Sequence, residues 1–142
     1  MTAEPSVGLA ITVSRGSSNN LFQVATLVRA ATALEMSVRV LFQGPSAAKL
    51  MRNRINLSEW SAIYQKIEPQ LNERLSAAEF SDLESFLRDA KEHGEDVAFW
   101  VSEQTVLSRN LHLEDLASFV DGAISDQAFE DLAGGAAAVL RF

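Results

Sequence analysis

The first part of the chain combines short apolar runs with a longer helical pattern. Residues 7–13 form a nearly continuous apolar run rich in β-branched side chains, which is typical of a strand buried on both faces of a parallel sheet. Between residues 21 and 36 the apolar positions follow helical spacing. Residues 38–42 then alternate as a second strand, which Gly44-Pro45 ends. Strand, helix and strand in this order predict a βαβ unit.

The region from residue 46 to residue 94 predicts helices in several pieces. Residues 47–54 predict one or two helical turns. Ser58 is the expected N-cap of a further helix, which carries Trp60 and is interrupted at Pro69. We therefore expect this region to cover the sheet with helices of different lengths.

A capping-box pattern marks the start of the next predicted helix. Ser76 and Glu79 have the spacing of such a box, and Gly94 stands where the helix is expected to end. The remaining predicted elements are a strand at 97–101, a broken helical crossing at 106–116, a strand at 119–124, a short helix at 126–132 and a last strand at 137–142. Alternating strands and helices predict a three-layer α/β/α sandwich around a five-stranded, mostly parallel sheet. The length suits a single domain over residues 1–142.

The net charge of −7 is concentrated in the last third of the chain. Acidic and basic residues balance up to Gly94, whereas Arg109 and Arg141 are the only basic residues after it, against nine acidic ones. An acidic surface repels phosphate backbones, so we expect no nucleic-acid partner. Two interpretations stay open: a solvated acidic face, and a docking face for a basic partner.

The absence of cysteine excludes several kinds of chemistry. The chain has no disulfide, no thiolate metal ligand and no cysteine nucleophile. His93 and His112 lack acidic neighbours at ligand spacing, so no metal site is expected, and no motif indicates a cofactor. No apolar run is long enough to cross a membrane and no secretory signal is evident, which favours a cytoplasmic protein.

Candidate ligand-binding residues come from the rule that ligands gather at the carboxyl ends of parallel strands. Those positions, with the polar loop after the first strand, give Ser14, Arg15, Asn19, Gln43, Gly44, Ser102, Glu103 and Thr105. The loop at 14–20 precedes a helix and could hold a small anion or nucleotide, although it lacks a glycine-rich phosphate motif. Alternatively, Ser102 and Glu103, with Arg15, could serve a small enzyme, Glu103 being a weak candidate for a general base.

Four segments of the sequence resemble the DsrE/DsrF-like family of sulfur-relay proteins. They are ATALEMSVRVLFQGP near the second strand, VAFWVSEQTVLSRNLHLEDL around the third, FVDGAISDQAFEDLAGGA around the fourth and AAVLRF at the end. The resemblance covers nearly the whole chain except a stretch at about residues 53–75. It implies a single DsrE-like domain with a helical insertion at 53–75, between strands 2 and 3.

One departure from the family pattern decides what the resemblance implies for function. In sulfur-carrying members a cysteine ends the third strand, and the matching residue here is Ser102, or Val101 if the register shifts by one. Serine cannot carry a persulfide, because that chemistry needs a thiolate. The resemblance therefore implies a non-catalytic structural or partner-binding component of a sulfur-relay or heterodisulfide-reductase-like sulfur-oxidation system. The implied partners are further copies in a trimer or hexamer, DsrE-like subunits in a hetero-oligomer, or a sulfur-carrier protein.

Overall fold

The computed structural model describes residues 7–70, 73 and 82–142. Five parallel strands form one sheet in the order β4-β3-β2-β1-β5. The strands are β1 (Val7–Val13), β2 (Val38–Phe42), β3 (Val97–Ser102), β4 (Gly122–Ile124) and β5 (Ala136–Arg141). The helices are α1 (Ser18–Ala33), α2 (Pro45–Lys49), α3 (Ala62–Gln65), α5 (Leu83–His93), α6 (Glu103–Ser108) and α7 (Asp126–Gly134), with a 3-10 turn η1 at Leu113–Asp115. The predicted three-layer α/β/α sandwich is confirmed.

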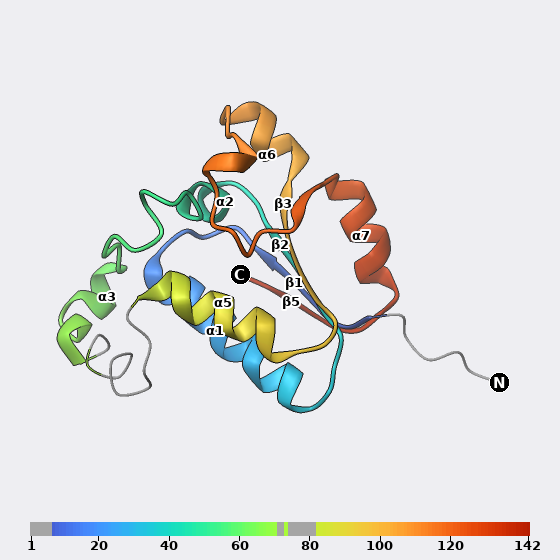
Figure 1. Cartoon of the computed structure of the whole chain (residues 1–142), viewed down its shortest axis with the longest axis horizontal. Coiled ribbons are helices and arrows are strands. Elements are labelled where there is room, and N and C mark those ends of the chain that lie inside the picture. The colour runs from blue at the N-terminus through green and yellow to red at the C-terminus, as the bar shows by residue number, and fades with distance from the viewer. Residues whose placement is uncertain (1–6, 71–72, 74–81) are drawn as a thin grey trace.

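The direction of the crossovers decides which helix covers which face of the sheet. From β1 to β3 each new strand is added on the same side, and α1 and α5 pack together on one face. The connection from β4 to β5 runs back across the sheet, and its helix α7 lies on the opposite face (Figure 1). Right-handed crossovers require this change of face when the direction reverses. No helix among the described residues is both long and apolar enough to span a bilayer.

The two faces of the sheet bury cores of different size. Under α1 and α5, β1 contributes Leu9, Ile11 and Val13 to a core that extends over most of the sheet. Phe99 lies at its centre, in edge-on contact with Phe42 and with a third phenylalanine from the loop before β4. Under α7 the buried cluster comprises Ala10, Leu41, Phe129 and Ala133. The α7 layer therefore covers less of the sheet than the opposite layer does.

The fourth strand is shorter than the sequence predicts. A strand was expected at 119–124, but β4 comprises only Gly122–Ile124. Phe119 is buried in the core against Phe99, and the Asp121 carboxylate accepts the Phe99 N–H at 2.8 Å. In a longer β4 a backbone carbonyl would accept the Phe99 N–H. Here the Asp121 carboxylate accepts it instead.

The helix predicted from an N-cap at Ser58 begins later in the chain than expected. Residues 58–61 are not helical, and α3 begins at Ala62. Trp60 is buried, and the Glu59 side chain accepts hydrogen bonds from two basic groups, so tertiary contacts hold this stretch outside a helix.

The helix expected after the Ser76 capping box corresponds, among the described residues, to α5 (Leu83–His93). Ser76 and Glu79 lie outside the described residues. The described part of that helix is α5, whose N-cap is Asp82, and Gly94 is its C-cap as predicted. Within the predicted insertion at 53–75, the described residues include α3 and further helical residues at 68–70 and 73.

Candidate functional site

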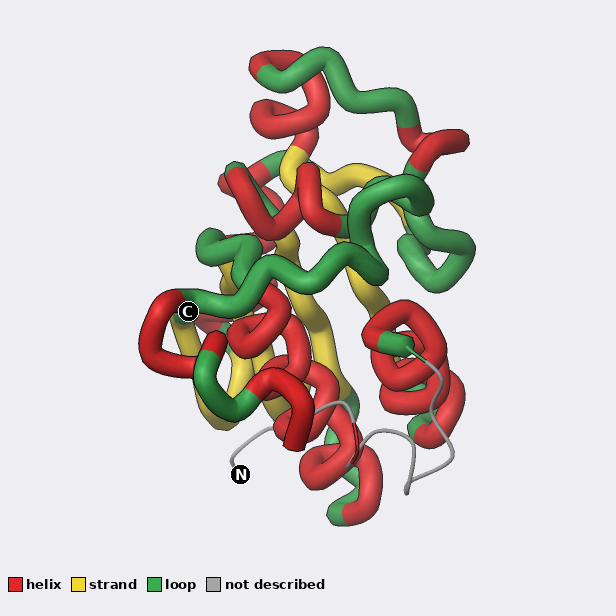
Figure 2. Tube along the Cα trace, turned by 90° about the vertical axis from the view of Figure 1, so that its left-hand side faces the viewer, coloured by secondary structure: helices red, strands yellow, loops and turns green. Residues whose placement is uncertain are grey.

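The carboxyl ends of β1, β2 and β3 lie side by side at one end of the sheet, where α2 and α6 begin (Figure 1). Loops and short helices gather at this end of the strands (Figure 2). Five of the predicted site residues lie at this end of the sheet, namely Ser14, Gln43, Gly44, Ser102 and Thr105. We name these five residues, together with Ser46 of α2, the strand-end cluster.

Hydrogen bonds connect the ends of β1 and β2 within the strand-end cluster. Gln43 donates from its side-chain amide to the Ser14 hydroxyl at 3.1 Å. The fully buried Ser46 hydroxyl accepts the Gln43 backbone N–H at 3.1 Å and donates to the Val13 carbonyl at 2.5 Å. The close approach also needs Gly16, because a Cβ there would lie 2.6 Å from the Pro45 carbonyl oxygen. This half of the cluster is therefore tightly packed as well as hydrogen-bonded.

The other half of the cluster joins β3 and α6 to the end of β2. Ser102 has no exposed surface, and its hydroxyl accepts the Thr105 N–H at 3.2 Å as the N-cap of α6. The Thr105 hydroxyl in turn accepts the Gly44 N–H at 2.9 Å. Gly44 has φ +57°, a left-handed conformation that favours glycine. Both hydroxyls thus stabilise backbone turns at the strand ends.

The other predicted site residues point to different surroundings. The Asn19 side-chain oxygen accepts hydrogen bonds from the N–H and the hydroxyl of Ser61, so it faces the loop before α3. Arg15 is exposed, and so is Glu103 at the start of α6. His112 is exposed at the N-cap of η1 and makes no capping hydrogen bond with its side chain. The structure therefore brings five uncharged candidates together, leaves the two charged ones at the surface and turns Asn19 toward the loop before α3.

This arrangement limits the chemistry of the strand-end cluster. A nucleophilic serine needs a general base within hydrogen-bond reach and an approach for the substrate. The Ser102 hydroxyl is buried and is engaged with the backbone of its own helix. Within the described ranges, no group of three or more histidine or acidic side chains is arranged to hold a metal ion. The geometry at Ser102 suits a structural cap.

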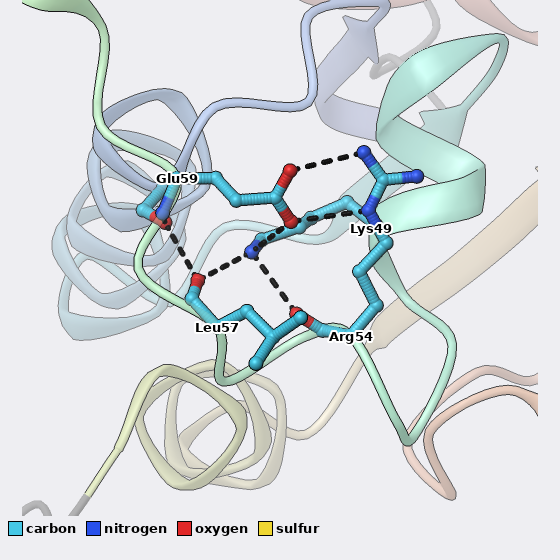
Figure 3. Close-up of polar contacts among 5 residues, drawn as sticks. Lys49, Arg54, Leu57 and Glu59 are labelled. Carbon is cyan, nitrogen blue, oxygen red and sulfur yellow. Dashed lines mark hydrogen bonds and ion pairs between the residues drawn. The ribbon is translucent and has the colours of Figure 1, made fainter.

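A second polar cluster, which the sequence did not reveal, lies beside the strand ends. The Lys49 side chain, at the end of α2, has no exposed surface. Its ammonium nitrogen donates to the carbonyls of Leu57 (2.6 Å) and Arg54 (3.0 Å) and to the Glu59 carboxylate (2.9 Å) (Figure 3). Arg54 donates from Nε and Nη2 to both oxygens of Glu59, each at 3.0 Å. We name Lys49, Arg54 and Glu59 the buried-lysine cluster.

The buried-lysine cluster fastens the loop before α3 to the start of α1. Glu59 donates its N–H to the Ser18 hydroxyl at 3.0 Å and accepts the Ser18 N–H on its carbonyl at 2.8 Å. One glutamate thus satisfies two basic side chains and one of the free N–H groups at the start of a helix. The side chain of Glu59 thus ties the loop to Lys49 and Arg54, and its backbone ties the loop to Ser18.

Two basic side chains of this cluster share one carboxylate. Hydrogen bonds from Arg54 and Lys49 lower the pKa of Glu59 to about 2. Burial lowers the pKa of Lys49, and the hydrogen bond to Glu59 partly offsets that effect. All three partners of the lysine nitrogen are acceptors, an arrangement that requires three N–H donors and hence the charged ammonium form.

The sequence carries one signal for this cluster. Lys49 follows Ala47 and Ala48 and precedes Leu50 and Met51, so a single cation interrupts an apolar run. Lysine is almost never fully buried without a partner, which makes such a position a candidate for a buried ion pair. The identity of the partner could not be read, because Glu59 approaches Lys49 only when the loop closes.

A separate open groove lies at the opposite end of the sheet. It has a volume of about 580 Å3 and runs between the ends of α1 and α5. His93 lies here, where its Nδ1 is 2.9 Å from the Thr32 hydroxyl. His93 is the last residue of α5 and directly precedes Gly94, where the helix was expected to end. Glu35 and Glu95 also line the groove, which is therefore acidic and distinct from the strand-end cluster.

Comparisons with known proteins bear on the fold. No family model matches the sequence, and no curated protein matches it. The structure is similar to that of MTH1491 from Methanobacterium thermoautotrophicum, a protein of unknown function, with a TM-score of 0.54 and 16% sequence identity. The match covers 95% of this chain and 99% of that chain. At this identity the similarity shows a shared fold over almost the whole of both chains.

Proposed function

We propose that the chain is a non-catalytic DsrE-like protein that acts as a structural or partner-binding subunit of an oligomer. The implied setting is a sulfur-relay or heterodisulfide-reductase-like sulfur-oxidation system. The observation that carries the proposal is Ser102, which is fully buried at the end of β3 and caps α6. By the resemblance, Ser102, or Val101 if the register shifts by one, stands where active members of the family have the sulfur-carrying cysteine.

The chemistry of sulfur transfer supports a non-catalytic role. A carrier residue must offer a thiolate that a donor and an acceptor can both reach. Serine offers no thiolate, and its hydroxyl here is turned into the first turn of α6. The neighbouring Gly44 and Thr105 are engaged with each other by a hydrogen bond, which further closes the strand ends.

The charge distribution supports a role in partner binding. Around the strand ends and the turn that follows, Glu103, Glu114 and Asp115 are exposed. The last third of the chain carries the whole net charge of −7, and an excess of charge of one sign steers the approach of an oppositely charged partner. Exposed acidic residues beside a buried Ser102 suit docking of a basic partner better than catalytic turnover.

The proposal is tested by measuring the mass of the protein in solution, alone and mixed with cysteine-bearing DsrE-like subunits. Size-exclusion chromatography with light scattering at micromolar concentration is expected to give a multiple of the 15.5 kDa chain mass, or a mixed complex. The protein mixed with an unrelated acidic protein of similar size serves as a control. A strict monomer that also forms no complex with the DsrE-like subunits would falsify the proposal.

A further inference from the structure

The two edges of the sheet differ in length and in protection. β4 forms one edge with three residues, and the Asp121 side chain beside it caps the neighbouring strand. β5 forms the other edge with six residues, Ala136–Arg141, and contains no proline and no glycine. Proteins usually shield a long edge with charge, proline, a bulge or a covering loop. In β5 only the terminal Arg141 is charged.

The exposed side chains of β5 are apolar. Ala137 and Ala138 are exposed, Val139 is 40% exposed and Leu140 is 37% exposed. The pairing of Ala10 with Val139 and of Ile11 with Leu140 places these two side chains on opposite faces of the sheet. Both faces of the strand are therefore apolar and accessible to solvent at this edge.

The hydrogen bonds of Phe142 show which backbone groups face outward. Phe142 donates its N–H to Thr12 and accepts the Ser14 N–H, each at 2.8 Å, so its peptide groups point toward β1. Successive residues of a strand point their N–H and C=O groups to opposite sides. Ala137, Val139 and Arg141 therefore present their backbone donors and acceptors at the open edge.

We propose that this edge pairs antiparallel with β5 of a second copy of the chain, about a two-fold axis at Val139, which joins the two sheets into one. The inference deepens the proposed function, on which it rests, by naming the surface through which the copies assemble. About this axis Val139 faces its own counterpart, and Ala137 faces Arg141 of the other copy. The outward N–H and C=O groups at each pair then bond across the interface.

Side chains across the proposed interface are complementary in size and charge. Leu140 lies across from Ala138 of the second copy, so a large apolar side chain meets a small one. Arg141 comes beside Ala137 of the second copy, just after the carboxyl end of its α7, where the helix dipole is negative. Within its own chain Arg141 pairs with Glu130 at 2.9 Å. The positive charge of each Arg141 is therefore already balanced, and the two arginines of the dimer do not face each other.

The interface is tested with two substitutions at Val139. Val139→Pro removes an outward N–H but leaves the bonds to β1, whereas Val139→Thr keeps the N–H and the β-branched shape. By light scattering, wild type and Val139→Thr are expected to have the same mass, and Val139→Pro half of it. Circular dichroism with a thermal melt checks that each variant folds. Unchanged mass in folded Val139→Pro would overturn the interface and leave the proposed assembly standing.

Amide exchange in the wild-type chain provides a second measurement that needs no variant. In the paired state the amides of Val139 and Leu140 are both protected, and dilution to monomer is expected to release Val139 alone. A chain that is monomeric by itself, with a freely exchanging Val139 amide at every concentration, would overturn pairing with a second copy. The proposed function would then be rejected only if the mixture with DsrE-like subunits also gave no complex.

Discussion

The strand-end cluster and the buried-lysine cluster lie near each other but are stabilised in different ways. At the strand ends, neutral hydroxyl and amide groups hydrogen-bond to each other and to backbone turns, as Ser102 does. In the other cluster a fully buried ammonium, Lys49, depends on one carboxylate and two carbonyls of a single loop. The family resemblance singles out a serine whose hydroxyl makes one capping hydrogen bond to the backbone, whereas Lys49, which the sequence analysis did not select, makes three hydrogen bonds, one of them to a carboxylate.

The difference follows from the cost of leaving each group without a partner. A buried hydroxyl that loses one hydrogen bond costs about 1–3 kcal/mol, whereas removing one member of a buried ion pair costs about 3–5 kcal/mol. Glu59 is one-third exposed, so water can solvate part of its charge, which places the expected cost at the lower end of that range. Substitutions at Lys49 should therefore destabilise the protein more than substitutions at Ser102.

Removal of the buried ammonium is expected to have the largest effect. Lys49→Ala leaves the carbonyls of Arg54 and Leu57 and part of the Glu59 carboxylate without a donor, and it opens a cavity beside α2. We expect the free energy of unfolding to fall by about 3 kcal/mol. Urea denaturation followed by circular dichroism measures the change.

A surface cation provides the matched control for that variant. Arg88, whose side chain is 40% exposed, pairs with Glu84 one turn earlier on α5 at 3.1 Å, and Arg88→Ala is expected to cost less than about 0.5 kcal/mol. If Lys49→Ala destabilises the protein no more than Arg88→Ala does, the buried-lysine cluster has no special role and the ranking of the two clusters is wrong.

The sequence predicted the layers of the fold better than it predicted the contacts between them. Periodicity located β1, α1 and β3 because their burial follows a regular local pattern. It failed at Phe119 and at Ser58, where a buried ring and a buried ion pair override local propensity. The strand-end residues could be predicted because parallel strands bring their carboxyl ends together. The pairing of Glu59 with Lys49 could not be predicted, because an irregular loop brings the two side chains together.

Acid is expected to weaken the buried-lysine cluster selectively. The folded-state pKa of Glu59, about 2, is below its ordinary value of 4.5, so the cluster contributes stability above about pH 4.5 and loses it as the pH falls toward 2. We expect this loss to amount to about 1–2 kcal/mol, since the carboxylate is partly solvated. Glu59→Gln is expected to be less stable at neutral pH and to have a flatter acid profile. Urea midpoints between pH 7 and pH 2.5 measure both.

A second glutamate distinguishes a local effect from general acid denaturation. The Arg141 guanidinium lowers the pKa of Glu130, but this pair lies at the surface, so Glu130→Gln is expected to leave most of the acid-dependent loss in place. Equal flattening of the acid profile by both substitutions would mean that burial of the lysine does not govern the pH dependence.

A smaller effect on stability than those at Lys49 and Glu59 is expected at Ser102. Ser102→Cys replaces a buried cap with a weaker acceptor of similar size, which we expect to cost about 1 kcal/mol. The new thiol is expected to react slowly with a thiol reagent in the folded protein and at once in denaturant, because Ser102 has no exposed surface. Ser108→Cys, at the exposed end of the same helix, is expected to react at once in both states. Fast labelling of folded Ser102→Cys, as fast as that of Ser108→Cys, would mean that the strand ends open readily to solvent. Ser102 would then be accessible to solvent, and its burial would no longer support the proposed non-catalytic role.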